Sequence, residues 1–190
     1  MRIVCIGDSL TYGYRIRRSE AWTHLLEKKY NIEVINKGIC GDSTGGMLAR
    51  FQQDVVLEKP SHVLIMGGTN DFIMGLSWEM VRANIFTMGH HAHAYGIIPI
   101  IGIPTPTEPE MAQKYWSSIT DFQRVNQEIE RYKDGIIDFA KKINFEVIDF
   151  YTNVIKELSI ENKEELYMDG LHWTAKGNAM LTQIIHLKGL

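Results

Sequence analysis

Short apolar runs alternate with amphipathic helical stripes along this chain, and the alternation limits its fold more than any other feature. Such runs, rich in Val and Ile, are typical of strands buried on both faces of a sheet. Parallel strands need long crossover connections, which are usually helices. The alternation therefore predicts a parallel sheet covered by helices on both faces. The expected strands are residues 3–6, 33–36, 62–66, 97–103 and 145–149.

Apolar residues at helical spacing mark the segments between these strands. We expect Ser19 to cap the first long helix, Pro60 to stop the second and Gly96 to follow the end of the third. Residues 104–109 contain three prolines, which argues against a helix or a central strand there. The expected helices have apolar stripes within residues 21–30, 47–55, 81–95, 122–143 and 175–187.

The length of 190 residues, 45% of them hydrophobic, suits one sizeable core, so we predict a single domain over residues 1–190. Five strands favour a flavodoxin-like strand order with a switch point beside the first strand. The predicted class is thus α/β, with a five-stranded parallel sheet in a three-layer, flavodoxin-like arrangement.

Charge and composition exclude several kinds of partner. The formal net charge of −3 gives no basic excess for nucleic acid or an anionic membrane, and the cluster of Arg15, Arg17 and Arg18 is small. Cys5 and Cys40 suggest neither a disulfide framework nor a zinc site. We expect no stable membrane insertion, because no apolar run approaches the length of a membrane span. No leader pattern precedes the first strand, so we expect a cytoplasmic protein; a removed signal peptide would leave the same sequence.

Polar, glycine-rich loops follow the first three expected strands, where ligands bind in open α/β sheets. The first strand runs into Gly7-Asp8-Ser9, a turn that presents a hydroxyl group. Such a tripeptide also occurs as an ordinary turn in which Asp8 or Ser9 caps the next helix. The catalytic interpretation therefore depends on a base, an acid and oxyanion donors elsewhere in the chain.

These other groups are present. Acyl transfer needs a nucleophile, a base and an acid that orients the base, and we assign these roles to Ser9, His172 and Asp169. The backbone N–H groups of Ser9 and Gly41, with the side-chain amide of Asn70, are the predicted donors to the oxyanion.

Four motif blocks occur in order along the chain, and three shorter segments accompany them. The blocks are Gly7-Asp8-Ser9-Leu10, Gly41-Asp42, Gly68-Thr69-Asn70-Asp71 and Asp169-Gly170-Leu171-His172, and the segments are Gly13-Tyr14-Arg15, Ala21-Trp22 and Leu48-Ala49-Arg50. They resemble those of the SGNH (GDSL) hydrolase family, in its bacterial esterase/thioesterase/lysophospholipase branch. This resemblance implies a metal-free esterase on a flavodoxin-like three-layer fold. A departure is Trp173, where many relatives have proline; it either leans over the site or packs.

Other polar residues have structural interpretations. His90, His91 and His93 lack convergent carboxylates, so we assign no metal ligands and expect them near a helix C-terminus. Asp8, like Asp42 and Asp71, is expected to brace a loop through backbone amides.

The segment Thr105–Ser118 is the candidate wall of an acyl pocket. It follows the fourth strand and carries Tyr115 and Trp116, which together with Phe72 and Met74 would line the pocket. Alternatively, these side chains pack on the edge of the sheet.

The predicted function is hydrolysis of small-molecule carboxylic esters or thioesters with short to medium acyl groups, without a cofactor. A carbohydrate O-deacetylase with the same triad is an alternative. A non-catalytic protein that binds an anion at helix N-termini is another, but it lacks a Walker or GxGxxG pattern and leaves Asp169 and His172 unexplained.

Overall fold

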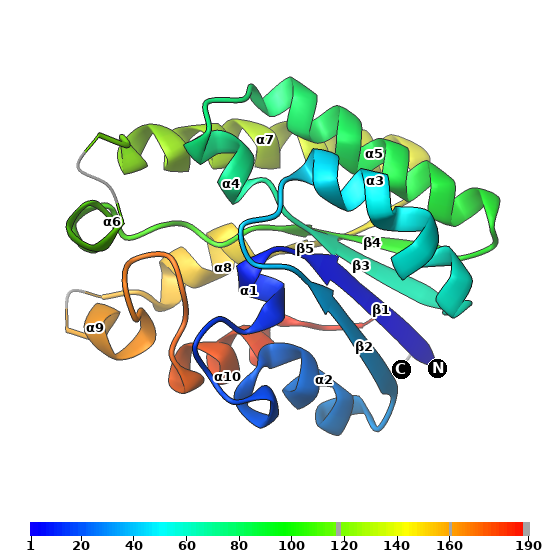
Figure 1. The fold of residues 1–190 in the computed structure, drawn as a ribbon, viewed down its shortest axis with the longest axis horizontal. Coiled ribbons are helices and arrows are strands. Elements are labelled where there is room, and N and C mark those ends of the chain that lie inside the picture. Colours follow the sequence, from blue (N-terminus) through cyan, green and yellow to red (C-terminus); the bar gives the residue numbers. More distant parts are fainter. Residues whose placement is uncertain (117–118, 160, 188–190) are drawn as a thin grey trace.

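The computed structural model describes residues 1–116, 119–159 and 161–187 and has an all-parallel, five-stranded sheet at its centre. The strand order is β2-β1-β3-β4-β5, which confirms the predicted flavodoxin-like order (Figure 1). The strands are β1 (Arg2–Gly7), β2 (Glu33–Gly38), β3 (His62–Met66), β4 (Ile98–Ile103) and β5 (Glu146–Asp149).

Helices cover both faces of the sheet, with α3, α5 and α7 on one side and α2, α8 and α10 on the other (Figure 1). The helices are α1 (Ser9–Tyr12), α2 (Trp22–Tyr30), α3 (Thr44–Asp54), α4 (Thr69–Ile73), α5 (Trp78–Ala94), α6 (Pro109–Tyr115), α7 (Phe122–Ile143), α8 (Phe150–Glu157), α9 (Lys163–Leu166) and α10 (Ala175–Ile184), with 3-10 turns at Arg18–Glu20 and Val56–Glu58.

The side chains of β1 alternate between the two hydrophobic layers. Val4 and Ile6 pack under α3 and α5, while Ile3 and Cys5 pack under α2 and α10. All four are fully buried. The first strand therefore lies between two apolar layers, and its carboxyl end is held firmly beside β2 and β3.

The beginning of α2 differs from the sequence prediction. Ser19 lies in the 3-10 turn and does not cap the helix, which begins at Trp22. The Trp22 backbone N–H instead donates to the side-chain oxygen of Asn178, 3.0 Å away on α10. Because this cap comes from a residue distant in sequence, local patterning could not indicate it.

The interpretation of residues 104–109 was partly wrong, because Pro109 begins α6. Proline is tolerated in the first helical turn, where its missing N–H would have no intrahelical acceptor. Glu108 caps this helix by accepting from the Met111 N–H at 2.7 Å. The sequence interpretation also missed α8 and α9 in the connection before α10, and α3 ends at Asp54 rather than at Pro60.

The end of α5 follows the prediction. Gly96 comes directly after the C-cap residue Tyr95 and has a φ of 72°, a conformation that glycine adopts without steric cost. No helix formed by the described residues is long and apolar enough to span a membrane.

Candidate active site

Ser9 is the first residue of α1, directly after β1. Asp8 is the N-cap, and its Oδ1 accepts the Leu10 N–H at 2.9 Å. The predicted capping role of Asp8 and the candidate nucleophile Ser9 therefore coexist in the same turn. Ser9 is 9% exposed and its hydroxyl group lines a cavity.

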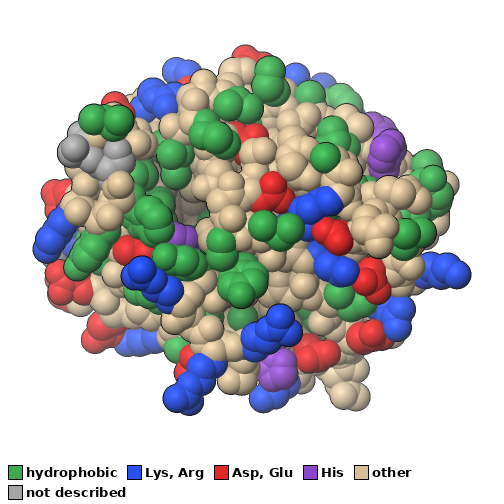
Figure 2. Space-filling model, in the orientation of Figure 1, with side chains coloured by type: hydrophobic (Ala, Val, Ile, Leu, Met, Phe, Trp, Pro, Cys, Tyr) green, Lys and Arg blue, Asp and Glu red, His purple; other side chains and the backbone are tan. Residues whose placement is uncertain are grey.

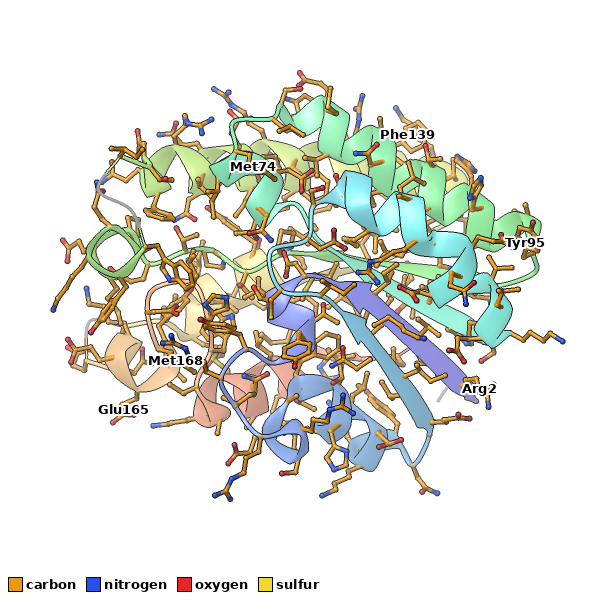
Figure 3. The ribbon with its side chains drawn as sticks, viewed as in Figure 1. Arg2, Met74, Tyr95, Phe139, Glu165 and Met168 are labelled. Carbon is orange, nitrogen blue, oxygen red and sulfur yellow. The ribbon has the colours of Figure 1, made fainter. Side chains whose placement is uncertain are left out.

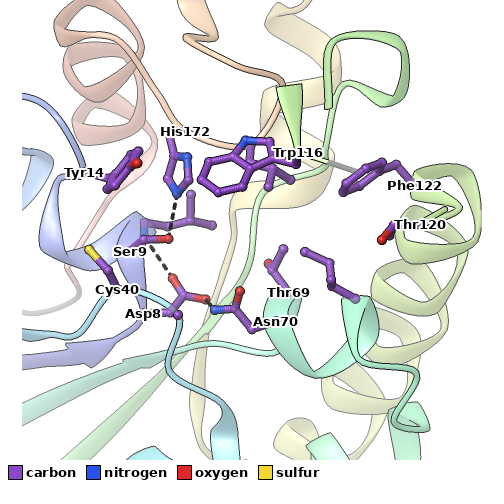
Figure 4. A pocket seen from close by; sticks show the side chains of 14 residues that line it. Asp8, Ser9, Tyr14, Cys40, Thr69, Asn70, Trp116, Thr120, Phe122 and His172 are labelled. Atoms are coloured by element: carbon purple, nitrogen blue, oxygen red, sulfur yellow. Dashed lines mark hydrogen bonds between the residues drawn. The ribbon is translucent and has the colours of Figure 1, made fainter. Parts of the chain in front are cut away.

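The hydroxyl of Ser9 is hydrogen-bonded to His172, with 2.8 Å between Ser9 Oγ and His172 Nε2 (Figure 4). The other ring nitrogen, Nδ1, lies 2.9 Å from Asp169 Oδ2. Asp169 Oδ1 also accepts the backbone N–H groups of Leu171 and His172, which fixes the carboxylate inside its own turn. The three predicted side chains are thus brought into one hydrogen-bonded chain.

Asp169 is in a state suited to orienting an imidazole. Burial alone raises the pKa of this carboxyl, but the hydrogen bonds and charge of His172 outweigh burial and hold the pKa below its ordinary value. An ionised Asp169 accepts a hydrogen bond from the Nδ1–H group, which leaves Nε2 unprotonated and able to accept the Ser9 proton.

Gly170 allows the turn that carries these residues. Its φ is 82°, and a Cβ there would lie 2.3 Å from the backbone nitrogen of Ala112 on α6. The Glu108 N–H donates to the Gly170 carbonyl at 2.8 Å. The histidine turn is therefore docked on the start of α6, a contact that the sequence did not indicate.

Gly41 and Asn70, the other predicted oxyanion donors, line the same cavity as Ser9. Gly41 has a φ of 78°, and open space surrounds the position of a Cβ there, so a substrate can approach its backbone. Asn70 Nδ2 donates to the Asp42 carbonyl at 2.9 Å and lies 3.5 Å from Asp8 Oδ2. One of its N–H bonds therefore ties α4 to the Gly41 loop.

Arg50 on α3 was quoted from the sequence only for family similarity, yet it holds three loop ends together. Its guanidinium donates to the carbonyls of Gly7 and Lys37, at the ends of β1 and β2, at 2.9 and 2.8 Å. It also pairs with Asp42 at 2.8 Å and Asp54 at 2.7 Å. The Leu-Ala-Arg similarity was the available signal, but helical spacing alone did not disclose these contacts.

Asp8 and Asp71 brace their loops by accepting backbone N–H groups, as predicted, whereas Asp42 pairs with a side chain. Burial raises the pKa of Asp8 to about 6, partly opposed by the Leu10 hydrogen bond and the charge of His172. Asp71 accepts the Thr44 N–H at 2.9 Å and the Thr44 hydroxyl at 2.6 Å. Asp42 uses its carboxylate for Arg50 rather than for a backbone amide.

A cavity of about 410 Å³ opens beside Ser9 and His172, within the size range of ligand pockets. Figure 2 shows hydrophobic side chains gathered around a hollow at the left of the view, in which a histidine is visible. The lining residues are Asp8, Ser9, Leu10, Tyr14, Cys40, Gly41, Thr69, Asn70, Ile73, Trp116, Thr120, Phe122, Leu171 and His172.

Trp116 is the member of the predicted pocket wall that lines this cavity. Phe72 is fully buried against Tyr132, so its prediction was wrong. Met74, the C-cap residue of α4, is 59% exposed and lies outside the lining (Figure 3). Tyr115 on α6 is also 59% exposed and outside the lining. Helical geometry explains this difference, because neighbouring residues on a helix point in different directions.

Trp173 packs rather than leaning over the site. It is 3% exposed, stacks on Tyr167 with ring centroids 4.0 Å apart and donates from Nε1 to Thr105 Oγ1 at 3.1 Å. Of the two alternatives for Trp173, the one in which it leans over the site as a pocket residue was therefore wrong. Ser118, the predicted end of the wall segment, lies outside the described residues.

Several lining residues were missed as pocket candidates, including Ile73, Phe122 and Leu171. Leu171 lies inside a motif block, Ile73 lies two residues after one, and Phe122 begins an expected helical stripe, so their apolar character was attributed to packing. His91 and His93 occupy the last turn of α5, as predicted. Within the described ranges, no group of three or more His, Cys, Asp or Glu side chains could hold a metal ion.

A model of the GDSL-like Lipase/Acylhydrolase family matches residues 5–180. The chain belongs to this family. The resemblance inferred from the four motif blocks is thereby confirmed.

Individual relatives cover different parts of the chain. It is 32% identical over 129 residues to Esterase TesA of Pseudomonas aeruginosa, spanning 65% of this chain and 62% of that protein. It is 48% identical over 86 residues to the acetylxylan esterase of Geobacillus stearothermophilus, which is 37% of this chain and 39% of that protein. The chain thus matches less than two thirds of the length of either relative.

A solved structure extends the comparison to the whole fold. A lipolytic protein of the G-D-S-L family from Desulfitobacterium hafniense matches with a TM-score of 0.78 and 26% identity, covering 97% of this chain and 99% of that one. The predicted SGNH-type fold is therefore confirmed.

Proposed function

We propose that this protein is a serine esterase that cleaves carboxylic esters or thioesters through an acyl-enzyme intermediate. The hydrogen-bonded chain from Ser9 through His172 to Asp169, opening into a cavity, carries the proposal. Membership of the GDSL-like Lipase/Acylhydrolase family supports it.

In the first step, Ser9 Oγ attacks the ester carbonyl carbon while His172 Nε2 takes the hydroxyl proton. Asp169 holds Nδ1 and stabilises the positive charge that forms on the ring. The carbonyl oxygen becomes an oxyanion, for which the N–H groups of Ser9 and Gly41 and the Asn70 amide are the proposed donors.

Collapse of the tetrahedral intermediate breaks the bond to the leaving alcohol or thiol, which receives the proton from His172 Nε2. The acyl group then remains as an ester on Ser9 Oγ. A water molecule, deprotonated by His172, attacks this ester, and collapse releases the carboxylic acid and regenerates Ser9.

The lining of the cavity supports the proposal that the substrate's acyl group is of short to medium length. Leu10, Ile73, Phe122 and Leu171 give it apolar walls next to the reacting hydroxyl. An acyl chain would lose contact with water along these walls, which favours binding by about 0.8 kcal/mol for each buried methylene.

A carbohydrate O-deacetylase is the second candidate, favoured by the 48% identical segment shared with the acetylxylan esterase. A deacetylase would leave most of the apolar wall unused, because an acetyl group carries only one methyl. The general esterase is therefore the preferred proposal. A purely anion-binding role is disfavoured because it gives no purpose to the Ser9–His172 hydrogen bond.

The test is labelling with a fluorophosphonate probe followed by a panel of aryl, thio and sugar esters of graded acyl length. We expect covalent labelling of the native protein and none in Ser9→Ala. Maximal rates on butyryl to octanoyl esters would support the general esterase. A maximum on acetylated sugars would favour the deacetylase, and absence of labelling and turnover would refute both.

A further inference from the structure

The imidazole of His172 lies between two aromatic side chains. Its centroid is 4.2 Å from the Tyr14 ring and 5.2 Å from the Trp116 ring, with interplanar angles of 37° and 57°. Figure 4 shows the two rings on opposite sides of the imidazole. Tyr14 follows α1, and Trp116 is the C-cap residue of α6. Neither contact has a role in the steps described above.

The Tyr14 and Trp116 rings contact parts of the imidazole that its hydrogen-bonding partners do not contact. Asp169 and Ser9 use the two nitrogens at the edge of the imidazole. Tyr14 and Trp116 limit tilting of the imidazole away from the hydrogen-bonded chain that joins Ser9, His172 and Asp169. Both also line the cavity, so they separate part of the histidine from solvent.

Aromatic faces attract cations within about 6 Å, and the attraction is stronger where water is displaced. In the proposed mechanism the imidazole is neutral before reaction and becomes a cation when it takes the Ser9 proton. Contacts with Tyr14 and Trp116 are consequently stronger in the transition state than in the resting enzyme. Only interactions with this property accelerate a chemical step.

We propose that Tyr14 and Trp116 are positioning residues that hold His172 in line with Ser9 and stabilise its protonated form. This inference rests on the proposed role of His172 as the general base. It assigns a function to two side chains outside the triad and the oxyanion donors.

Other charged or titratable groups near His172 come from several loops. Asp169 faces Nδ1, and Asp8, beside Ser9, interacts with the histidine charge. The Arg15 guanidinium lies over the Tyr14 ring, 5.1 Å from its centroid, and Cys40 lines the same cavity. Substituting an aromatic residue by leucine leaves all these groups in the chain, so the change isolates the ring.

The experiment compares Tyr14→Leu and Trp116→Leu with the ring-preserving variants Tyr14→Phe and Trp116→Phe. Tyr115→Leu is the matched control, because Tyr115 is a neighbouring aromatic residue that is 59% exposed and outside the cavity lining. The readouts are NMR titration of the His172 imidazole, assigned with His172→Ala, and the pH profile of kcat/KM on a small acetyl ester.

Loss of the ring removes stabilisation of the protonated form, so protonation needs a lower pH. We expect each leucine variant to lower the titration midpoint by about half a pH unit, which is about 0.7 kcal/mol. The acid limb of kcat/KM should move the same way, and plateau kcat should fall about threefold. The phenylalanine variants and Tyr115→Leu should stay within about 0.2 pH units of the native protein.

Equal shifts in the leucine and phenylalanine variants, or no shift in either leucine variant, would overturn the inference. Trp116 is 45% exposed, so Trp116→Leu keeps the test valid if Tyr14→Leu does not fold. The titration needs no turnover, which separates the two proposals. A shifted midpoint without any esterase activity would refute the proposed function and leave the ring contact established.

Discussion

The reacting groups and the wall of the cavity are held in different ways. Ser9 and His172 each lie in a short turn whose own carboxylate caps it, Asp8 in one case and Asp169 in the other. The wall contains Trp116 and Phe122, which reach the cavity only because α6 docks on the histidine turn and α7 crosses above the sheet (Figure 1). Local backbone geometry therefore sets the chemistry, and tertiary packing sets the space beside it.

Substitutions in the triad give the strongest test of the claim that the two turns hold the reacting groups. Ser9→Ala and His172→Ala should each lower kcat by about three orders of magnitude or more, and the double variant should lose little further activity. Steady-state kinetics on an aryl ester measures these losses. Losses that multiply in the double variant would show that the two side chains do not act as a unit.

Asn70→Ala should lower kcat by roughly 100- to 1000-fold, because the amide is the proposed donor to an oxyanion that exists only during reaction. KM should change little. The same amide ties α4 to Asp42, so thermal unfolding of the variant is the control for damage to the loop. Normal kcat with raised KM would instead assign Asn70 to binding the ester ground state.

Asp8 tests whether ionisation of the buried carboxyl that caps the Ser9 turn lowers the free energy of unfolding. Its pKa is raised from 3.8 to about 6 in the folded protein, so the native state binds this proton more tightly than the unfolded chain does. The free energy of unfolding should then fall as pH rises from about 4 to about 6 and remain lower above this range.

Asp8→Asn keeps the acceptor for the Leu10 N–H and removes the charge. We expect it to raise the free energy of unfolding at pH 8 by up to about 3 kcal/mol, with no gain at pH 4. Denaturant unfolding at both pH values measures the difference. Asp149→Asn, at the half-buried N-cap of α8, is the control. A gain that is equal at both pH values would contradict this account.

Arg50→Lys should reduce kcat about tenfold with little change in KM, because one ammonium cannot keep the forked contacts that align the Gly7, Lys37 and Asp42 ends. Asp54→Asn removes one ion pair of Arg50 but leaves its bonds to Gly7, Lys37 and Asp42 in place, so it should leave kcat nearly unchanged. Equal losses in both variants would mean that general stability, not loop alignment, depends on Arg50.

The cavity wall should give the smallest effects and change selectivity rather than mechanism. Rate should rise about fourfold for each methylene until the pocket ends, and Ile73→Phe should bring that end to shorter acyl chains. Hydrolysis of an acetyl ester should persist. Tyr115→Ala is the control outside the cavity, and an unchanged chain-length profile in Ile73→Phe would exclude this wall as the acyl site.

The sequence by itself determined that the sheet is parallel with a flavodoxin-like strand order, and which loops carry the candidate site residues. Parallel strands end at one edge of the sheet, so Ser9, Gly41 and Asn70 had to approach one another once the alternation was recognised. The Asp169–His172 turn could be predicted for a similar reason, because its hydrogen bonds join residues only three apart. The hydrophobic period of an element and the hydrogen bonds within a turn each depend on residues that are close in sequence.

The tertiary structure decided the contacts between segments that are distant in sequence. Asn178 replaces the expected cap Ser19, Arg50 links three loops, and Trp116 rather than Tyr115 reaches the histidine. Each depends on the rotation of a helix about its axis and on its docking against a remote partner, where a shift of one residue turns a side chain by about 100°. Composition and spacing did not distinguish these two neighbours, so only the folded chain separates Trp116, which lines the cavity, from Tyr115, which does not.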